Sequence, residues 1–104
     1  MNALKSFEHM DIIGKRWFQK TYGNTYHSVV VRVDGEVLDS IPFTYGYDEM
    51  YKQSAFELLQ KHGYYFGNVQ GEENNEYGKF LEDIREFRSK FTIVCSDVSR
   101  KTDL

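Results

Sequence analysis

The sequence predicts an α+β fold, in which a three-stranded antiparallel meander has two helices packed on one face and a C-terminal strand joins the sheet. Three observations predict it. β-Branched and aromatic residues surround an Asp-Gly turn pair, two later segments carry apolar residues at helical spacing, and an alternating apolar segment follows them. The 104 residues, 40% hydrophobic and 16% aromatic, suffice for one core, so we expect a single domain over 1–104.

The second and third strands are predicted from the pair Asp34-Gly35, which supplies the positive φ angles of a two-residue hairpin loop. This loop joins a strand over 25–33 to a strand over 36–41. The latter is expected to stop near Pro42, because proline has no N–H to donate within a sheet. The expected register pairs Val33 with Glu36, Val31 with Leu38, and Ser28 with Ile41.

The first strand is predicted over 16–22, because Gly23-Asn24 can form a second two-residue loop; residues 1–14 then form an N-terminal segment. Side chains alternate between the two faces of a sheet. One face is therefore predicted to carry Phe18, Val29, Val31, Val33 and Leu38. The other is predicted to carry Trp17, Gln19, Thr21, Tyr26, Val30 and Arg32. We expect the first face to be core and the second to be mixed.

Two helices follow. The first is predicted over 48–62, with Asp48 as its N-cap and Gly63 as its C-terminal stop. Its apolar positions at helical spacing are Tyr51, Ala55, Leu58 and Leu59. The second is predicted over 75–89, capped by Asn74 or Asn75. Its apolar stripe consists of Tyr77, Phe80, Leu81, Ile84 and Phe87, so it is amphipathic and is expected to pack on the sheet.

The remaining segments are a final strand over 91–96 and a polar tail over 97–104 that is expected to fray. The glycine-punctuated segment 62–73 is predicted to hold a short strand, with a binding loop as the alternative.

Composition restricts the function classes. The net charge of −3 argues against a general polyanion-binding domain, which would be basic. No apolar run reaches the roughly 20 residues that cross a bilayer, and the first residues lack the apolar core of a signal peptide. The single cysteine cannot form an intramolecular disulfide. We therefore expect a cytoplasmic protein without a membrane partner.

The densest candidate site is the segment 15–27, which gathers aromatic and cationic side chains around one turn. A protein-binding surface is favoured, because Trp, Tyr and Arg anchor protein interfaces. Its predicted anchors are Arg16, Trp17, Tyr26 and Arg32, with Tyr45 and Tyr47 as second choices. The nucleic-acid alternative uses Lys15, Arg16, Lys20 and Arg32 on phosphates and the aromatics on bases. A third interpretation is that the aromatics pack beneath a helix.

The sequence favours a protein that is not an enzyme. His9, His27, His62 and Cys95 show no close metal-ligand spacing, so neither a metal nor a cofactor is expected. Cys95 lies among apolar strand residues and is expected to be an inert core residue. A small enzyme with His27 as a base beside a neighbouring carboxylate stays as a second alternative. The edge strands of a small sheet can also pair between copies, which leaves a homodimer open.

Two resemblances add expectations. Three strands followed by a helix, with Val33-Asp34-Gly35-Glu36 at the hairpin, resemble the core of a double-stranded-RNA-binding domain. That family has a basic cluster at the start of its last helix, whereas this chain has Asp48-Glu49-Met50-Tyr51 there, so the resemblance concerns topology and implies no RNA-binding residue.

The second resemblance is to small uncharacterised accessory proteins encoded by bacteriophages and prophages. It is carried by Lys15-Arg16-Trp17-Phe18, Gly23-Asn24-Thr25-Tyr26-His27, Pro42-Phe43 and Tyr45-Gly46-Tyr47. It implies a bacterial host cytoplasm and stoichiometric binding to a host component. The expected function is thus an accessory or inhibitory factor that binds a host protein.

Overall fold

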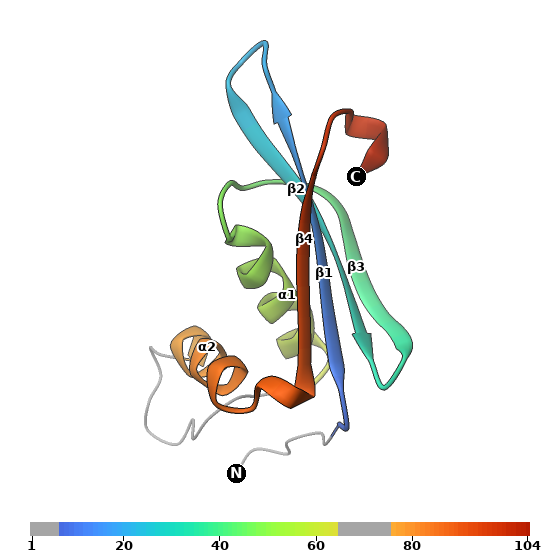
Figure 1. Ribbon diagram of the computed structural model, residues 1–104, viewed down its shortest axis with the longest axis vertical. Helices are drawn as coiled ribbons and strands as arrows, with labels where there is room; N and C mark the ends of the chain where they lie inside the picture. The colour runs from blue at the N-terminus through green and yellow to red at the C-terminus, as the bar shows by residue number, and fades with distance from the viewer. Residues whose placement is uncertain (1–6, 65–75) are drawn as a thin grey trace.

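A four-stranded sheet in the order β3-β2-β1-β4 carries both helices on one face (Figure 1). The computed structural model describes residues 7–64 and 76–104. The elements are β1 (Met10–Gln19), β2 (Asn24–Val33), β3 (Glu36–Tyr45), α1 (Met50–Lys61), α2 (Glu76–Glu86) and β4 (Phe91–Val98), with short 3-10 turns η1 (Arg88–Lys90) and η2 (Lys101–Asp103). The first three strands form the predicted antiparallel meander, and β4 pairs parallel to β1. The predicted α+β fold is thereby confirmed.

The first strand is longer than predicted. β1 begins at Met10 and not at Arg16, so the expected N-terminal segment 1–14 supplies half of a strand. Its turn is also different, because Gln19 pairs with Asn24 and the N–H of Gly23 donates to the Gln19 carbonyl at 2.8 Å. The prediction of a two-residue loop at Gly23-Asn24 was therefore wrong. The predicted assignment of side chains to the two faces of the sheet is nevertheless correct, because the actual register differs from the predicted one by an even number of residues.

The hairpin at Asp34-Gly35 is confirmed, with φ angles of 53° and 87° and Val33 opposite Glu36. The predicted register holds through Arg32, which faces Val37, and was wrong beyond it, because an irregularity lies between Val31 and Arg32. Val31 therefore faces Asp39 rather than Leu38, and Ile41 faces Val29 rather than Ser28.

The third strand does not stop at Pro42. It continues to Tyr45, with a second irregularity opposite the segment between His27 and Val29. A proline is accommodated here because β3 is an edge strand, whose outer N–H groups need no partner strand.

Helix α1 is confirmed, but Asp48 is not its N-cap. Asp48 has a φ of 58°. The N-cap residue is Glu49, whose side chain makes no capping hydrogen bond. The predicted stop at Gly63 is confirmed by a φ of 90°. The N–H groups of Gly63 and Tyr64 then bond back to the last turn at 3.0 and 2.9 Å, the pattern of a Schellman motif.

Helix α2 is shorter than predicted and ends at Glu86. Phe80 is fully buried, whereas Phe87, the last member of the predicted stripe, is 49% exposed because it lies beyond the end of the helix. The predicted cap at Asn74 or Asn75 and the predicted short strand within 62–73 fall on 65–75, outside the described residues.

The C-terminal segment contains the end of β4 and the η2 turn. β4 runs on to Val98, and η2 then places the Lys101 ammonium 4.7 Å from the centre of the Phe43 ring. The predicted strand end at 96 was therefore wrong, because Asp97 and Val98 also pair with β1. The fraying of the residues after Val98 stays a prediction.

The core lies between the sheet and α1. Its buried members are Met10, Ile12, Val29, Val31, Tyr51, Ala55, Phe56, Leu58, Leu59, Tyr64 and Phe80. Phe18 points to the same side but is 54% exposed, so its predicted place in the core was wrong. It lies near the outer end of β1, far along the strand from the buried Met10 and Ile12. None of the described helices combines the length and the apolar character that a membrane span requires.

Candidate functional site

The sheet face opposite the helices carries a cluster of aromatic side chains that includes three of the predicted anchors. Both α1 and α2 lie on the other side, and among the described helices and turns the short η2 turn lies near this face (Figure 1). Trp17, Tyr26, Phe43 and Tyr45 gather there from three neighbouring strands, and we call these four residues the aromatic column. In the described part of the chain, the predicted Trp17/Tyr26 face is thus not covered by a helix.

The rings of the aromatic column stack on one another across the strands. Tyr26 lies directly opposite Trp17, with ring centres 5.9 Å apart and planes at 27°. On its other side Tyr26 stacks on Phe43 at 4.7 Å and 16°, while Tyr45 meets it edge-on at 5.8 Å. The 4.7 Å separation matches the spacing of adjacent strands, so the rings stand upright on the sheet.

This stacking decides which parts of the rings a partner can reach. Because β2 lies between β1 and β3, Trp17 and Phe43 occupy opposite faces of the Tyr26 ring. The Lys101 ammonium lies over the Phe43 ring. The column therefore presents ring edges and tyrosine hydroxyl groups outward, and the outer face of Trp17 has no ring contact among the described residues.

The four predicted phosphate-binding cations are not brought together. We call the sheet face opposite the helices the open face and the other the helix side. Lys15 and Arg32 point to the open face, whereas Arg16 points to the helix side. Lys20 lies in the turn after β1. Arg32 is opposite Asp11, nine positions from Lys20, which corresponds to roughly 30 Å along the strand. The contiguous basic patch that the nucleic-acid alternative predicts is absent from the described residues.

Arg16 is therefore not a neighbour of the column. Its Nε donates to Asp97 Oδ1 at 2.9 Å, and its Nη1 donates to the Asp48 carbonyl at 2.8 Å. These bonds fix the start of the α1 segment and the end of β4 to β1. Tyr47, a second-choice anchor, is exposed in the connection between β3 and α1 and has no described ring contact with the column.

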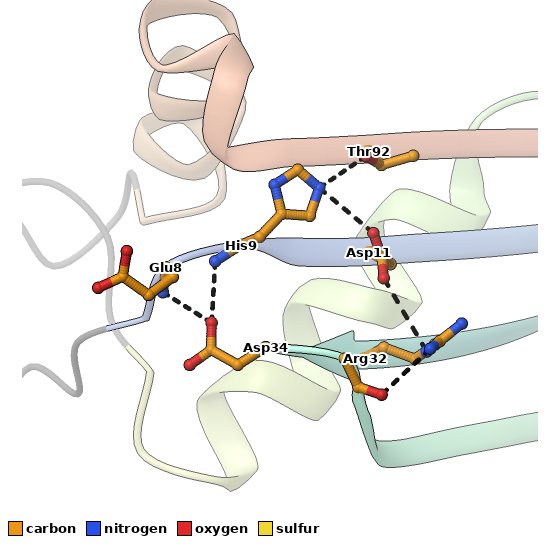
Figure 2. A network of polar contacts seen from close by, with 7 residues as sticks. Glu8, His9, Asp11, Arg32, Asp34 and Thr92 are labelled. Carbon is orange, nitrogen blue, oxygen red and sulfur yellow. Dashed lines mark hydrogen bonds and ion pairs between the residues drawn. The ribbon is translucent and has the colours of Figure 1, made fainter.

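A polar network occupies the other end of the open face (Figure 2). His9 Nε2 lies 2.7 Å from Thr92 Oγ1 and 3.3 Å from Asp11 Oδ1. Asp11 Oδ2 is 3.9 Å from the Nε of Arg32, a buried atom without a hydrogen-bond partner among the described groups. Asp34 Oδ1 accepts the backbone N–H groups of residues 8 and 9 at 2.7 and 2.9 Å.

The network resembles a catalytic triad in composition but not in geometry. In a triad the carboxylate and the hydroxyl contact different nitrogens of the histidine ring, so that one orients the ring and the other gives up its proton. Here Asp11 and Thr92 compete for the same Nε2. The contacts instead tie the ends of β1, β2 and β4 together.

His27, the base of the enzyme alternative, is buried at 1% exposure beneath α1. Its Nδ1 lies 3.1 Å from the Gly46 carbonyl and its Nε2 lies 2.8 Å from Ser54 Oγ. The carbonyl can only accept, so Nδ1 carries the proton and Nε2 accepts from the serine hydroxyl. Both nitrogens are thus engaged away from solvent. Burial raises the pKa of the Cys95 thiol, which disfavours the reactive thiolate.

Sequence reasoning found Trp17, Tyr26 and Tyr45 but missed Phe43 and Lys101. The missed signal was the alternation Phe43, Tyr45 immediately after Pro42, which continues the strand pattern. Across residues 7–64 and 76–104, no three His, Cys, Asp or Glu side chains are placed to hold a metal ion. No protein-family model, curated protein or solved structure matches this chain, so neither resemblance gains support from such a comparison.

Proposed function

We propose that this protein is a non-enzymatic binding protein, a phage-type accessory or inhibitory factor, and that it holds a host protein against the aromatic column. The observation that carries the proposal is the stacking of Trp17, Tyr26 and Phe43 on a sheet face without a helix. Tryptophan and tyrosine are the residues that most often dominate the binding energy of protein interfaces. The rings are already packed, so a partner orders few side chains on docking.

A protein partner fits the column better than a single-stranded nucleic acid does. Binding of bases to a sheet depends on free aromatic faces and on cations that follow the backbone. The faces of Tyr26 are occupied by neighbouring rings, and Arg16 and Arg32 lie away from the column. Outward-facing ring edges and hydroxyl groups suit the mixed polar and apolar surface of a protein.

The single tryptophan of the chain provides a direct assay, because Trp17 belongs to the column. A partner is first captured from bacterial lysate and purified, and its binding is then followed by the change in Trp17 fluorescence. Tyr45→Ala removes an edge-on contact at the rim and is expected to weaken binding about tenfold, the effect of one interface anchor.

The matched control is Phe87→Ala, which removes an aromatic side chain of similar exposure at the helix side. It is expected to leave the affinity unchanged. Equal affinities of the wild type and Tyr45→Ala would refute the proposal. Saturable quenching by single-stranded DNA or RNA that weakens steeply with salt would refute it in favour of the nucleic-acid alternative.

A further inference from the structure

The two edges of the sheet differ in how they are protected against strand pairing. β3 contains Pro42 and two register irregularities, and it carries Glu36 and Asp39. Natural proteins use proline, bulges and charges in this way to block pairing at an edge. The β4 edge has no proline and no register irregularity, since residues 91–98 pair with residues 10–17 of β1 without a register shift. In the described chain, β4 has β1 as its single strand neighbour.

Val94 is the second feature of this edge. It lies in the middle of β4, points to the open face and is 49% exposed. Thr92 and Ser96, its neighbours on the same face, are small and uncharged. The open face of β4 therefore lacks the charged residues that keep edges apart.

The helix side of the same edge has a groove of about 580 Å³ between the helices and β4. Phe91 and Ile93 line it from the strand, while Lys52, Arg85 and Arg88 line it from the helices and η1. Lys52 is paired with Glu49 at 2.7 Å. Arg85 and Arg88 have no ion-pair partner within the described residues, so the groove offers two uncompensated positive charges next to the first half of β4.

The opposite end of β4 carries a negative charge. Asp97 is 76% exposed, and Arg16 bonds to its Oδ1, which leaves Oδ2 without a described partner. Positive charge near one end of an edge strand and negative charge at the other are complementary when two copies pair antiparallel. Each end of one strand then meets the opposite end of its copy.

Symmetry fixes the remaining geometry. An antiparallel pair of identical edge strands is related by a two-fold axis perpendicular to the sheet, which keeps both helix layers on one side. Side chains opposite each other must then share a face, so odd positions pair with odd and even with even. With Val94 at the axis, Phe91 lies opposite Asp97 of the partner subunit. Asp97 of the partner subunit thus lies at the groove that Arg85 and Arg88 line.

We propose that two copies of this chain associate through antiparallel pairing of their β4 edges, with Val94 at the two-fold axis, to form one continuous eight-stranded sheet. The pairing covers the exposed Val94 side chain and supplies the two arginines of each groove with a carboxylate. Because it uses an edge and not a face, it leaves the aromatic column of each copy open. It stands independently of the proposed function of the column.

The first test is the mass in solution, measured by sedimentation equilibrium over a range of concentrations. A dimer has twice the 12.3 kDa mass of one chain. Val94→Lys places like charges opposite each other and is expected to weaken the dimer at least about tenfold, whereas the β-branched Val94→Thr keeps it. The side chain points to the open face, so the melting temperature checks that both variants are folded. A mass of one chain up to about 1 mM would overturn the proposal.

The second test fixes the geometry by disulfide formation. In a Cys95→Ala background, Val94→Cys puts two thiols opposite each other at the axis, within the Cα separation that a disulfide allows. Mild oxidation is expected to yield a covalent dimer within the time in which Val37→Cys, an exposed valine on the β3 edge, stays monomeric. Equal cross-linking of the two variants would indicate random collision and would overturn the proposal.

Discussion

The close fit of Gly14 beneath the Tyr51 ring gives a quantitative prediction for Gly14→Ala. A Cβ atom at this position would lie 2.7 Å from Cδ2 and 2.8 Å from Cγ of Tyr51. The ring is 6% exposed and belongs to the first turn of α1, so it has no free direction in which to move. Overpacking of this kind costs about 1–3 kcal/mol. Removing a glycine from a strand interior returns roughly 0.5–1 kcal/mol. We therefore expect a net loss of about 1 kcal/mol, the middle of the range that these two effects allow.

Urea denaturation of the wild type and Gly14→Ala measures this loss. A double-mutant cycle with Tyr51→Ala tests whether the loss of stability comes from the clash with the Tyr51 ring. That change removes the two clashing ring atoms and leaves the Tyr51 Cβ, which lies 3.2 Å from the added Cβ at position 14. In the Tyr51→Ala background Gly14→Ala is expected to be neutral or stabilising. The cycle is measured in sucrose, which keeps the destabilised Tyr51→Ala protein folded. An equal loss in both backgrounds, or a gain in the wild type, would refute the steric reasoning.

Three further predictions concern buried or paired polar groups. Ser54→Ala leaves His27 Nε2 buried without its donor and is expected to cost about 1–3 kcal/mol in urea denaturation; an unchanged midpoint would contradict the assigned bond. Burial raises the pKa of Tyr51 from 10.0 to about 12. Because the tyrosine of the unfolded chain ionises first, the free energy of unfolding falls as the pH rises from 10 to 12. Tyr51→Phe should lack this loss, and urea midpoints across that pH range measure it. The hydrogen bond from His62 holds the pKa of Asp39 below 3.8. The ionised Asp39 therefore stabilises the fold fully above pH 3.8, and this stabilisation is lost as the pH falls below that value. Asp39→Asn should show a shallower acid transition by circular dichroism.

The fold could be predicted from local signals wherever those signals determine the chain by themselves. Asp34-Gly35 fixed its hairpin, because few other residue pairs adopt two positive φ angles. The assignment of side chains to faces was also correct for β1 and β2, since it depends on the parity of the register alone. The register itself depends on tertiary contacts. Met10 and Ile12 are buried against the helices, and this burial draws the first strand upstream of the predicted start.

The errors at Pro42 and Asp48 both concern where an element ends or begins. Pro42 is permitted in a strand only because β3 lies at the edge of the sheet, and the order of strands is not a local property. Asp48 lies one residue before the actual N-cap, where its positive φ turns the chain from the strand into α1. The error at Pro42 reached the candidate site, because stopping the strand there removed Phe43 from the column and left Tyr26 with one face unassigned.

The proposed dimer through the β4 edge determines the distance between the aromatic columns of its two copies, and hence the geometry of a partner that binds both columns. Trp17 pairs with both Tyr26 and Val98, so the aromatic column lies level with the end of β4, four residues from Val94. In the proposed dimer the two Tyr26 side chains are five strands apart, about 24 Å, and eight residues apart along the strands, about 26 Å, which together give about 35 Å. A partner with two-fold symmetry and matching sites would gain avidity from this arrangement, whereas a partner with one site would not. Val94→Lys should therefore weaken binding to a symmetric partner and leave binding to a one-site partner unchanged, while Tyr45→Ala should weaken both. Fluorescence titration of the two variants against the same purified partner separates these cases, and a loss from Val94→Lys with a one-site partner would place the β4 edge inside the contact surface.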